Sequence, residues 1–425
     1  MKLKQNYDLS EILLNGVSTF VFKITGLLLA YLVMLFITRS FGSAVFGRYS
    51  IAITFSQLLV LVFTFGLPVA IIRLLTDIDH FDKQPKTNFL KKVMTITLIS
   101  SMIISISLFF LSEIIAIHLF KDQSLIVYFK ILSYFIIPLM FHEVLLNFFR
   151  GTKEFKKYNL FMFVLPSLLF LGIFYWLLKS YANEFITILS FGLSIAIVFI
   201  IELILYALLN YATKKNYSTN KLFQLSFPMM LSSTVLFLLN WTDIFMLGAM
   251  VTSEEVGIYN LAFKIASIGL LIIIVINVVI GPKIAELYSK NDLITLHRII
   301  VKSTHIIALL TIPIIIIIQV FRTDILAYFG QEFAQGDTVL LILSFGVLVN
   351  ALSGNVDQIL NMTDNQKIMR NLTFFCLIEN IVLNAILIPR YGITGAAIAS
   401  LATHFSLNMA SIYYIKKRLG FYTFI

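Results

Sequence analysis

Long apolar segments, separated by short polar breaks, follow one another along almost the whole chain. Each runs for about 20 to 30 residues, which is the length that an α-helix needs to cross the hydrocarbon core of a bilayer. A transmembrane β-barrel would show shorter segments of alternating polarity instead. Hydrophobic residues make up 59% of the chain and charged residues 13%, too few charges for an ordinary soluble domain. The sequence therefore predicts an all-α integral membrane protein.

The lengths and spacing of these segments predict about twelve transmembrane helices. In the first half we expect them at 10–38, 46–74, 90–112, 125–149, 159–179 and 184–209. In the second half we expect them at 222–250, 255–280, 300–321, 337–361, 369–389 and 393–415. The first apolar run shows no convincing small-residue cleavage site, so we interpret it as a retained helix rather than a signal peptide.

The Lys and Arg residues between the predicted helices are distributed asymmetrically. With the amino terminus in the cytoplasm, 23 of them fall in cytoplasmic segments and six in outer ones. This bias predicts a multi-pass protein with both termini in the cytoplasm. It also accounts for the net charge of +10 without a nucleic-acid partner, which we do not expect. The single cysteine, Cys376, lies in an apolar segment and is interpreted as a packing residue.

A short motif recurs in the two halves of the chain. Phe46–Ala52 (FGRYSIA) returns as Val256–Ala262 (VGIYNLA), 210 residues later, with a glycine and a tyrosine at matching positions. We interpret the glycine as permitting a close turn and the tyrosine as an interfacial anchor. Chance similarity between apolar sequences is the alternative. A true repeat predicts two six-helix bundles, 1–210 and 211–425, related by a pseudo-two-fold axis along the membrane normal around a central cavity.

Five ionisable residues lie well inside the predicted helices: Lys23, Asp243, Lys264, Asp357 and Glu379. Each would cost about 2.5 to 3.5 kcal/mol on insertion scales, so we expect them to face a wet cavity or one another. The alternative is that they form hydrogen bonds and ion pairs that only hold the bundle together.

Polar neighbours at helical spacing accompany these five residues. The stripes are Asn15, Thr19, Lys23 and Gly26; Ser233, Asn240 and Asp243; Asn260, Lys264 and Ser267; Asn350, Gly354, Asp357 and Asn361; and Glu379, Asn380 and Asn384. Glu143 and Glu202 lie nearer helix ends, where we expect a long side chain to reach water. His142 stands alone and is interpreted as a packing or hydrogen-bonding residue. No group of residues has metal-ligand spacing, so no metal site is expected.

Three motifs resemble the polysaccharide flippases, the Wzx-type branch of the superfamily that includes the MATE drug exporters. They are Thr38–Ser50 (TRSFGSAVFGRYS), Asp243–Gly248 (DIFMLG) with the following Glu255–Ala262, and Ile388–Ala397 (IPRYGITGAA). The usual outer Leu-Gly of the family reads Phe41-Gly42 here, which is a mild departure. The resemblance covers nearly the whole chain and implies a MATE-like fold.

The resemblance also implies a function. A protein of this family would be a transporter and no enzyme, moving undecaprenyl-diphosphate-linked oligosaccharide units for O-antigen, lipopolysaccharide or capsule across the bacterial inner membrane. The units would pass from the cytoplasmic to the periplasmic leaflet. Its partners would be this lipid-linked substrate, membrane lipid, a glycan polymerase and a chain-length regulator. No cofactor is expected beyond a coupling H⁺ or Na⁺.

Under this hypothesis, Lys23 and Lys264 attract the anionic headgroup of the lipid. Asp243, Asp357 and Glu379 are candidates for ion coupling, and Asn240 is a polar residue of the cavity. A MATE-type exporter of small cations is one alternative, although two lysines would repel such substrates. A glycan polymerase or ligase is another, but such enzymes usually carry a large periplasmic loop with catalytic Arg or His. No loop predicted here exceeds about 20 residues, and loops of that length carry no separate domain.

A substitution of Lys23 directly tests the hypothesis that this residue binds the headgroup. Replacing Lys23 with Ala is expected to abolish transport while leaving the protein in the membrane, because the substitution removes a cation that neutralises the headgroup. Transport measured at the wild-type rate would remove Lys23 from the mechanism.

Overall fold

The computed structural model describes residues 2–76, 88–181, 183–208 and 218–424, and the regular elements in these ranges are all helices. Within the described ranges, ten helical segments are long and apolar enough to cross a membrane. Two of the ten contain a glycine with non-helical dihedral angles, Gly42 in α1 (Lys2–Phe63) and Gly392 in α15 (Gln366–Leu419). Dividing both helices at these glycines gives the twelve crossings that hydropathy predicts. The all-α membrane fold is thereby confirmed.

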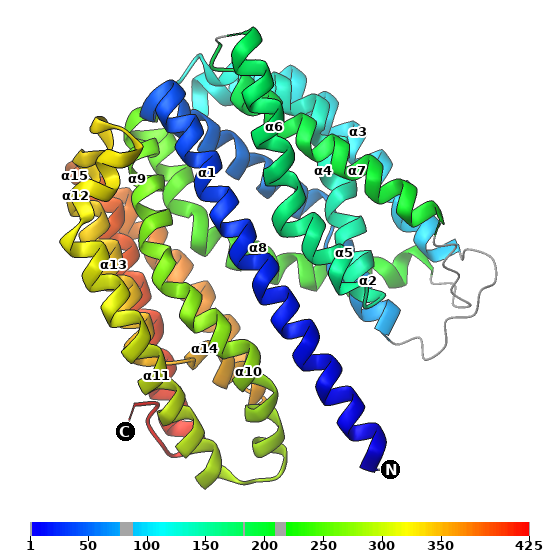
Figure 1. The fold of residues 1–425 in the computed structure, drawn as a ribbon, viewed down its shortest axis with the longest axis vertical. Helices are drawn as coiled ribbons and strands as arrows, with labels where there is room; N and C mark the ends of the chain where they lie inside the picture. Colours follow the sequence, from blue (N-terminus) through cyan, green and yellow to red (C-terminus); the bar gives the residue numbers. More distant parts are fainter. Residues whose placement is uncertain (1, 77–87, 182, 209–217, 425) are drawn as a thin grey trace. The chain divides into compact units, whose positions relative to one another are not determined.

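The other helices follow one another with short connections (Figure 1). In the first half they are α2 (Leu67–Thr76), α3 (Asn88–Ile114), α4 (Leu125–Gly151), α5 (Phe155–Asn159), α6 (Leu165–Ser180) and α7 (Ile186–Leu208). In the second half they are α8 (Thr219–Met250), α9 (Ser253–Ala266), α10 (Leu270–Ser289), α11 (Leu293–Val320), α12 (Arg322–Phe329), α13 (Asp337–Ser353) and α14 (Val356–Met362). Short π-helical turns η1 (Ile115–Leu119) and η2 (Leu160–Val164) and 3₁₀ turns η3 (Ser267–Gly269) and η4 (Gln331–Gly336) complete the chain.

Two of the predicted helices are interrupted rather than continuous. The 46–74 helix breaks at Gly66 (φ +70°) and the 337–361 helix at Gly354 (φ +76°), a backbone conformation that suits glycine. The Thr304 side chain packs directly against Gly354, where a β-carbon would clash. The prediction of one polar stripe from Asn350 to Asn361 is therefore wrong, because the helix ends at Ser353 and a new one begins at Val356.

The chain forms two compact units. The first contains the residues up to Phe41 and Ile51–Thr234, and the second contains Gly42–Ser50 and the residues from Val235 onward. The short segment Gly42–Ser50 thus packs with the C-terminal half of the chain. The predicted division into two bundles at residue 210 stays a prediction.

Each unit has its own apolar core. In the first unit, α2, α3, α4 and α7 bury a phenylalanine-rich cluster that includes Phe89, Phe148 and Phe149. In the second unit, α10, α11, α14 and α15 bury a cluster rich in isoleucine. Large apolar side chains also point outward, such as Phe110 and Leu309, which are 75% and 71% exposed. A soluble protein would not expose so many, whereas a lipid-facing surface requires them.

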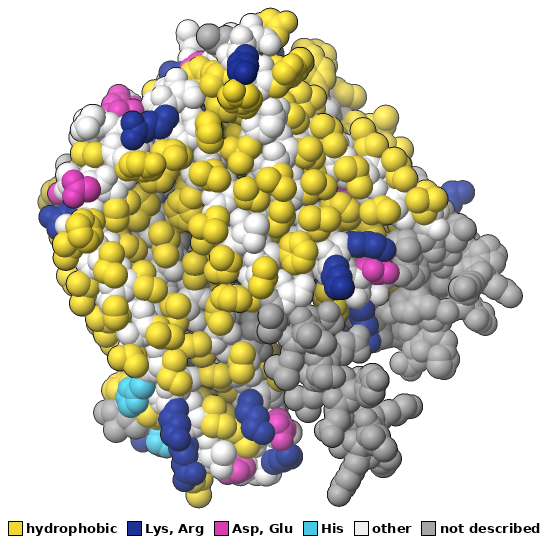
Figure 2. All heavy atoms as spheres, viewed as in Figure 1, with side chains coloured by type: hydrophobic (Ala, Val, Ile, Leu, Met, Phe, Trp, Pro, Cys, Tyr) yellow, Lys and Arg dark blue, Asp and Glu magenta, His cyan; other side chains and the backbone are white. Residues whose placement is uncertain are grey.

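Figure 2 shows how this surface changes along the second unit. Hydrophobic side chains cover the middle of its visible face, and charged side chains gather at the end where α10 meets α11. Lys283 and Lys290 both bind Glu286 there, at 2.9 and 2.6 Å. The hydrogen bonds from Lys290 and Lys283 lower the pKa of Glu286 to about 2. Charged groups thus gather at this end of the second unit, beyond the hydrophobic middle of the visible face.

The two copies of the repeated motif contact each other reciprocally inside the second unit. A β-carbon on Gly47 would meet the backbone of Ser253 and Gly257, and one on Gly257 would meet the backbone of Ser43 and Gly47. These pairs, 43 with 253 and 47 with 257, share the 210-residue offset of the repeat. Reciprocal contacts are the mark of a local two-fold axis. Two small residues four positions apart on each helix let the backbones approach this closely.

A hydrogen bond joins the same two segments, in which the Asn260 side-chain amide donates to the Ser50 hydroxyl at 2.6 Å. These two residues are also 210 positions apart, and both are buried. The repeat is thus more than chance similarity of apolar sequence, because its matching positions meet in the fold.

Enlarging either glycine of this contact tests it. Gly47→Ala and Gly257→Ala are each expected to destabilise the protein by about 1 to 3 kcal/mol, because a methyl group would push two helix backbones apart. Gly172→Ala is the matched control, since nothing lies within 4 Å of its added methyl group. The measurement is the thermal unfolding midpoint of the detergent-solubilised protein. Equal midpoints for all three variants would contradict the close contact.

Candidate functional site

The carboxylate of Asp243 lies at the centre of a buried polar cluster in the second unit. Its Oδ2 accepts hydrogen bonds from the Tyr259 hydroxyl, at 2.5 Å, and from the Ser400 hydroxyl. Its Oδ1 accepts from the side-chain amides of Asn384, at 2.7 Å, and Asn380, at 3.3 Å. Asp243 is only 7% exposed. Four donors therefore compensate a carboxylate that α8 carries into the membrane.

Local structure explains how distant residues meet at Asp243. Thr252 and Glu255 form a capping box at the start of α9, which fixes the turn after α8 and brings Tyr259 back alongside Asp243. Asn380 and Asn384 are four residues apart and so share one face of α15. The break at Gly392 turns the second part of α15 back, which lets Ser400 approach the same carboxylate.

The cluster has unused acceptor capacity. The side-chain oxygen of Asn384 is buried and has no hydrogen-bond partner among the described residues. A cavity of about 30 Å³ adjoins the cluster, with Ser400, His404 and Asn350 in its lining. The rest of its lining is mostly apolar, with side chains such as Phe263, Leu270 and Val347. A carboxylate oxygen and an amide oxygen are ligands that suit a small cation.

The other site residues predicted in the second unit lie elsewhere. Lys264 on α9 is half-buried, with its Nζ 4.6 Å from the centre of the Trp241 ring. Glu379 is half-buried and accepts a hydrogen bond from Ser406 at 2.7 Å. Asn240 and Asp357 are exposed, and the Asn240 amide binds the carbonyl of its own helix at Leu236. Of the predicted polar stripes, Asp243, Asn380 and Asn384 are brought together here.

The remaining predicted residue, Lys23, lies in the first unit on α1 and is half-buried. Asn159 donates a hydrogen bond to Thr19 at 2.8 Å, and Gly26 packs against the backbone of Phe163. Because Thr19, Lys23 and Gly26 share one face of the helix, Lys23 lies on the face that meets α5 and the π-turn η2. Thr19 and Gly26 of the predicted stripe thus contact these elements, and the role of Lys23 stays a prediction. The Asn15 side chain lies outside the described residues.

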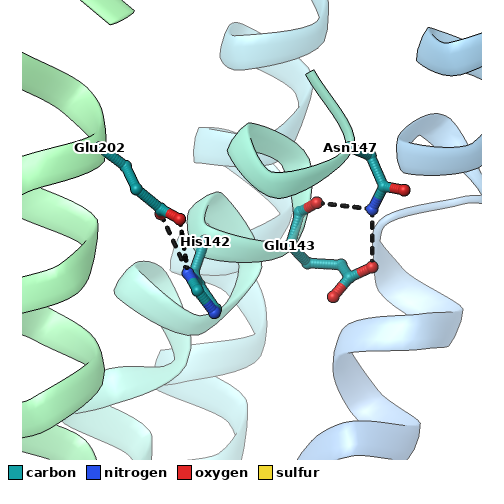
Figure 3. A network of polar contacts seen from close by, with 4 residues as sticks. All are labelled: His142, Glu143, Asn147 and Glu202. Carbon is teal, nitrogen blue, oxygen red and sulfur yellow. Dashed lines mark hydrogen bonds and ion pairs between the residues drawn. The ribbon is translucent and has the colours of Figure 1, made fainter. Parts of the chain in front are cut away.

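Sequence reasoning misplaced two residues. Tyr259, expected as an interfacial anchor, is 1% exposed and binds Asp243. Glu202, expected to reach water, is fully buried and pairs with His142 at 2.9 Å (Figure 3). These pairings join residues 16 and 60 positions apart, so no helical period could reveal them. Ser400 was also missed, because a serine in an apolar helix gives no distinctive signal.

Metal-binding side chains do not gather in the part of the chain that the structure describes. No group of three or more His, Cys, Asp or Glu side chains there could hold a metal ion. The Asp243 cluster is instead built from one carboxylate, two amides and two hydroxyls.

Comparison with known families identifies the chain. Residues 12–288 match the family described as polysaccharide biosynthesis protein, which is more than half of the sequence. The chain belongs to the polysaccharide biosynthesis protein family. Residues 228–386 also match the MatE family. The family resemblance that the sequence motifs indicated is thereby confirmed.

Similar proteins that carry names extend this result. Two proteins of Haloferax volcanii, the probable low-salt glycan biosynthesis flippase Agl15 and the probable flippase AglR, are 29% and 31% identical over 45% and 41% of this chain. The matches span 40% and 36% of those proteins, about two fifths of their length. The capsular polysaccharide biosynthesis protein CapF of Staphylococcus aureus is 22% identical over 94% of this chain and 98% of its own.

Solved structures share the fold. The lipid II flippase MurJ in an inward closed conformation has a TM-score of 0.75 at 18% identity, over 95% of this chain and 87% of its own. An outward-facing multidrug resistance MATE family transporter of the MOP superfamily has a TM-score of 0.66 at 14% identity, over 96% and 95%. The MATE-like fold expected for this polysaccharide biosynthesis protein is thus confirmed.

Removing one donor tests the Asp243 cluster. Tyr259→Phe is expected to destabilise the protein by about 1 to 3 kcal/mol, because a buried hydrogen bond to a carboxylate is lost and nothing replaces it. Tyr391→Phe is the matched control, since Tyr391 is 58% exposed. Thermal unfolding of both purified variants measures the difference. A Tyr259→Phe protein as stable as the control would mean that the cluster is not formed.

Proposed function

We propose that this protein is a flippase that moves a lipid-linked oligosaccharide between the two leaflets of a membrane. The observation that carries the proposal is the match of residues 12–288 to the polysaccharide biosynthesis protein family. Relatives named as flippases and a relative named for capsular polysaccharide biosynthesis support it. The ten apolar segments provide the multi-pass membrane body that such transport needs.

The finer proposal concerns the substrate and the direction of transport. We take the substrate to be undecaprenyl-diphosphate bearing an O-antigen or capsule repeat unit, moved from the cytoplasmic to the periplasmic side of a bacterial inner membrane. The asymmetry of Lys and Arg supports termini in the cytoplasm. A glycan polymerase and a chain-length regulator would then act on the delivered units.

Lysines are the proposed ligands of the anionic headgroup. Lys23 and Lys264 each place an ammonium group within an apolar helix, and each is half-buried. The Lys264 ammonium group is held over the face of Trp241, which fixes its position. A diphosphate would gain more from such a cation than it would in water, because the surroundings are less polar.

Asp243 is the proposed site of ion coupling. Its carboxylate and the unpaired oxygen of Asn384 offer oxygen ligands to Na⁺, and the carboxylate can also take H⁺. Either cation would compensate the buried negative charge, so its binding and release can bias two arrangements of the helices around the cluster. Glu379 and Asp357 lie outside this cluster and remain further candidates for coupling.

The MatE match over residues 228–386 favours one rival, a small-molecule exporter. The two functions predict different effects when the protein is missing. Loss of a flippase leaves lipid-linked repeat units in the cytoplasmic leaflet and removes surface glycan. Loss of an exporter raises sensitivity to toxic cations and leaves surface glycan intact.

Deleting the gene in its own organism tests the proposal, with a probe that reaches only the outer leaflet. Repeat units inaccessible to the probe, together with loss of surface glycan and restoration by the intact gene, are the expected result. Asp243→Asn should restore little glycan, because it removes the charge that binds the coupling cation, whereas Asp337→Asn, in an exposed pair with Arg322, should restore it fully.

Two results would contradict the proposal. Units that reach the outer leaflet unpolymerised would show that the protein is a polymerase or ligase. Unchanged surface glycan with new drug sensitivity would show that it is an exporter.

A further inference from the structure

A second buried carboxylate, that of Glu202, lies in the first unit and is not part of the Asp243 cluster of the second unit. Glu202 on α7 is fully buried, and both of its carboxylate oxygens face Nδ1 of His142 on α4, at 2.9 and 3.1 Å (Figure 3). Both helices are among the candidate membrane spans. An acid and a base thus share one site inside the membrane.

Apolar side chains surround this pair. Val198, one turn before Glu202, and Leu145, one turn after His142, are fully buried. The rings of Phe141 and Phe199 pack against each other beside the pair, with centres 5.5 Å apart. Such surroundings give a lone charge little solvation. The charge on the pair must therefore be balanced within the pair.

Charged groups nearby do not supply that balance. Glu143, the other residue whose charge acts on Glu202, is also acidic. Its carboxylate accepts a hydrogen bond from Asn147 at 2.8 Å and leaves α4 on the side away from Glu202 (Figure 3). Among the described residues, His142 and Glu143 are the groups whose charges act on Glu202.

Proton binding is the remaining way to balance the charge. The pair without a proton is a neutral imidazole beside a carboxylate, with a net charge of −1. One added proton gives the pair a net charge of zero, either as imidazolium and carboxylate or as imidazole and carboxylic acid, and apolar surroundings favour zero net charge over −1. Histidine is suited to this exchange because its unperturbed side chain titrates between about pH 5 and 8.

The two members of the pair differ in accessibility. The His142 side chain keeps 11% of its surface exposed, whereas Glu202 keeps none. Its second ring nitrogen points away from Glu202 (Figure 3). A proton therefore reaches the imidazole before the carboxylate, which lies behind it and provides the counter-charge.

We infer that His142 and Glu202 form a proton-binding site in the first unit, which takes up one proton from water on one side of the membrane and returns it to water on the other during each transport cycle. This inference rests on the proposed flippase function for its role in transport, but proton binding itself does not. The site differs from the Asp243 cluster, so it adds a second coupling position to the chain. A permanently charged structural pair is the alternative.

Proton titration of the purified full-length protein in lipid nanodiscs tests the binding step without any substrate. Glu202→Gln keeps the size of the side chain and should release about one proton fewer than wild type between about pH 5 and 8. Glu113→Gln, at an exposed position of α3, is the matched control and should leave the proton release of the pair unchanged. His142→Gln provides a second variant, and unchanged elution on size exclusion confirms that each variant is folded. Coincident curves for wild type and Glu202→Gln would overturn the inference.

Transport in a pH gradient tests the coupling step. In vesicles containing the protein and a lipid-linked oligosaccharide, one pH unit should change the leaflet distribution by up to about tenfold for each coupled proton. Glu202→Gln should abolish this response, and the exposed control Glu113→Gln should retain it. A Glu202→Gln protein with the full response would overturn the coupling role. If wild-type protein moved no oligosaccharide, the flippase proposal would fail, and the titration would still decide whether the pair binds a proton.

Discussion

Hydrocarbon offers no water to a polar group, and this constraint governs the whole molecule. Backbone groups meet it by forming helices, which are the regular elements of the described residues. Polar side chains meet it by binding one another: four donors surround Asp243, His142 faces Glu202, and Asn260 binds Ser50. Since each of these groups is costly in an apolar helix, their pairing decides which helices must pack together.

Glycines decide where the helices can bend and approach. The break at Gly392 brings Ser400 to a carboxylate that also binds two asparagines from the first part of the same helix. Gly47 and Gly257 allow the repeated segments to meet backbone to backbone. The polar clusters and the glycines are therefore connected, because close approach of two backbones is what lets short polar side chains reach their partners.

Much of this fold can be predicted from the sequence, because hydropathy and helix length act over neighbouring residues. The spans and the face of α1 that carries Thr19, Lys23 and Gly26 follow from local periodicity. The importance of Asp243 also follows, because a carboxylate in an apolar helix is expensive wherever it lies. Its partners could not be predicted, since Tyr259 and Ser400 come from other segments and a helical period says nothing about which helix is adjacent. The pairing of His142 with Glu202 escaped prediction for the same reason.

The central claim, that the protein moves a lipid-linked oligosaccharide between the leaflets, is tested most directly with purified protein in sealed vesicles. A defined undecaprenyl-diphosphate oligosaccharide is placed in both leaflets, and an added glycosidase that cannot cross the membrane removes the outer sugars over time. The account predicts that wild-type protein makes nearly all of the oligosaccharide accessible, whereas protein-free vesicles protect the inner half. Equal protection in vesicles with and without the protein would contradict the account.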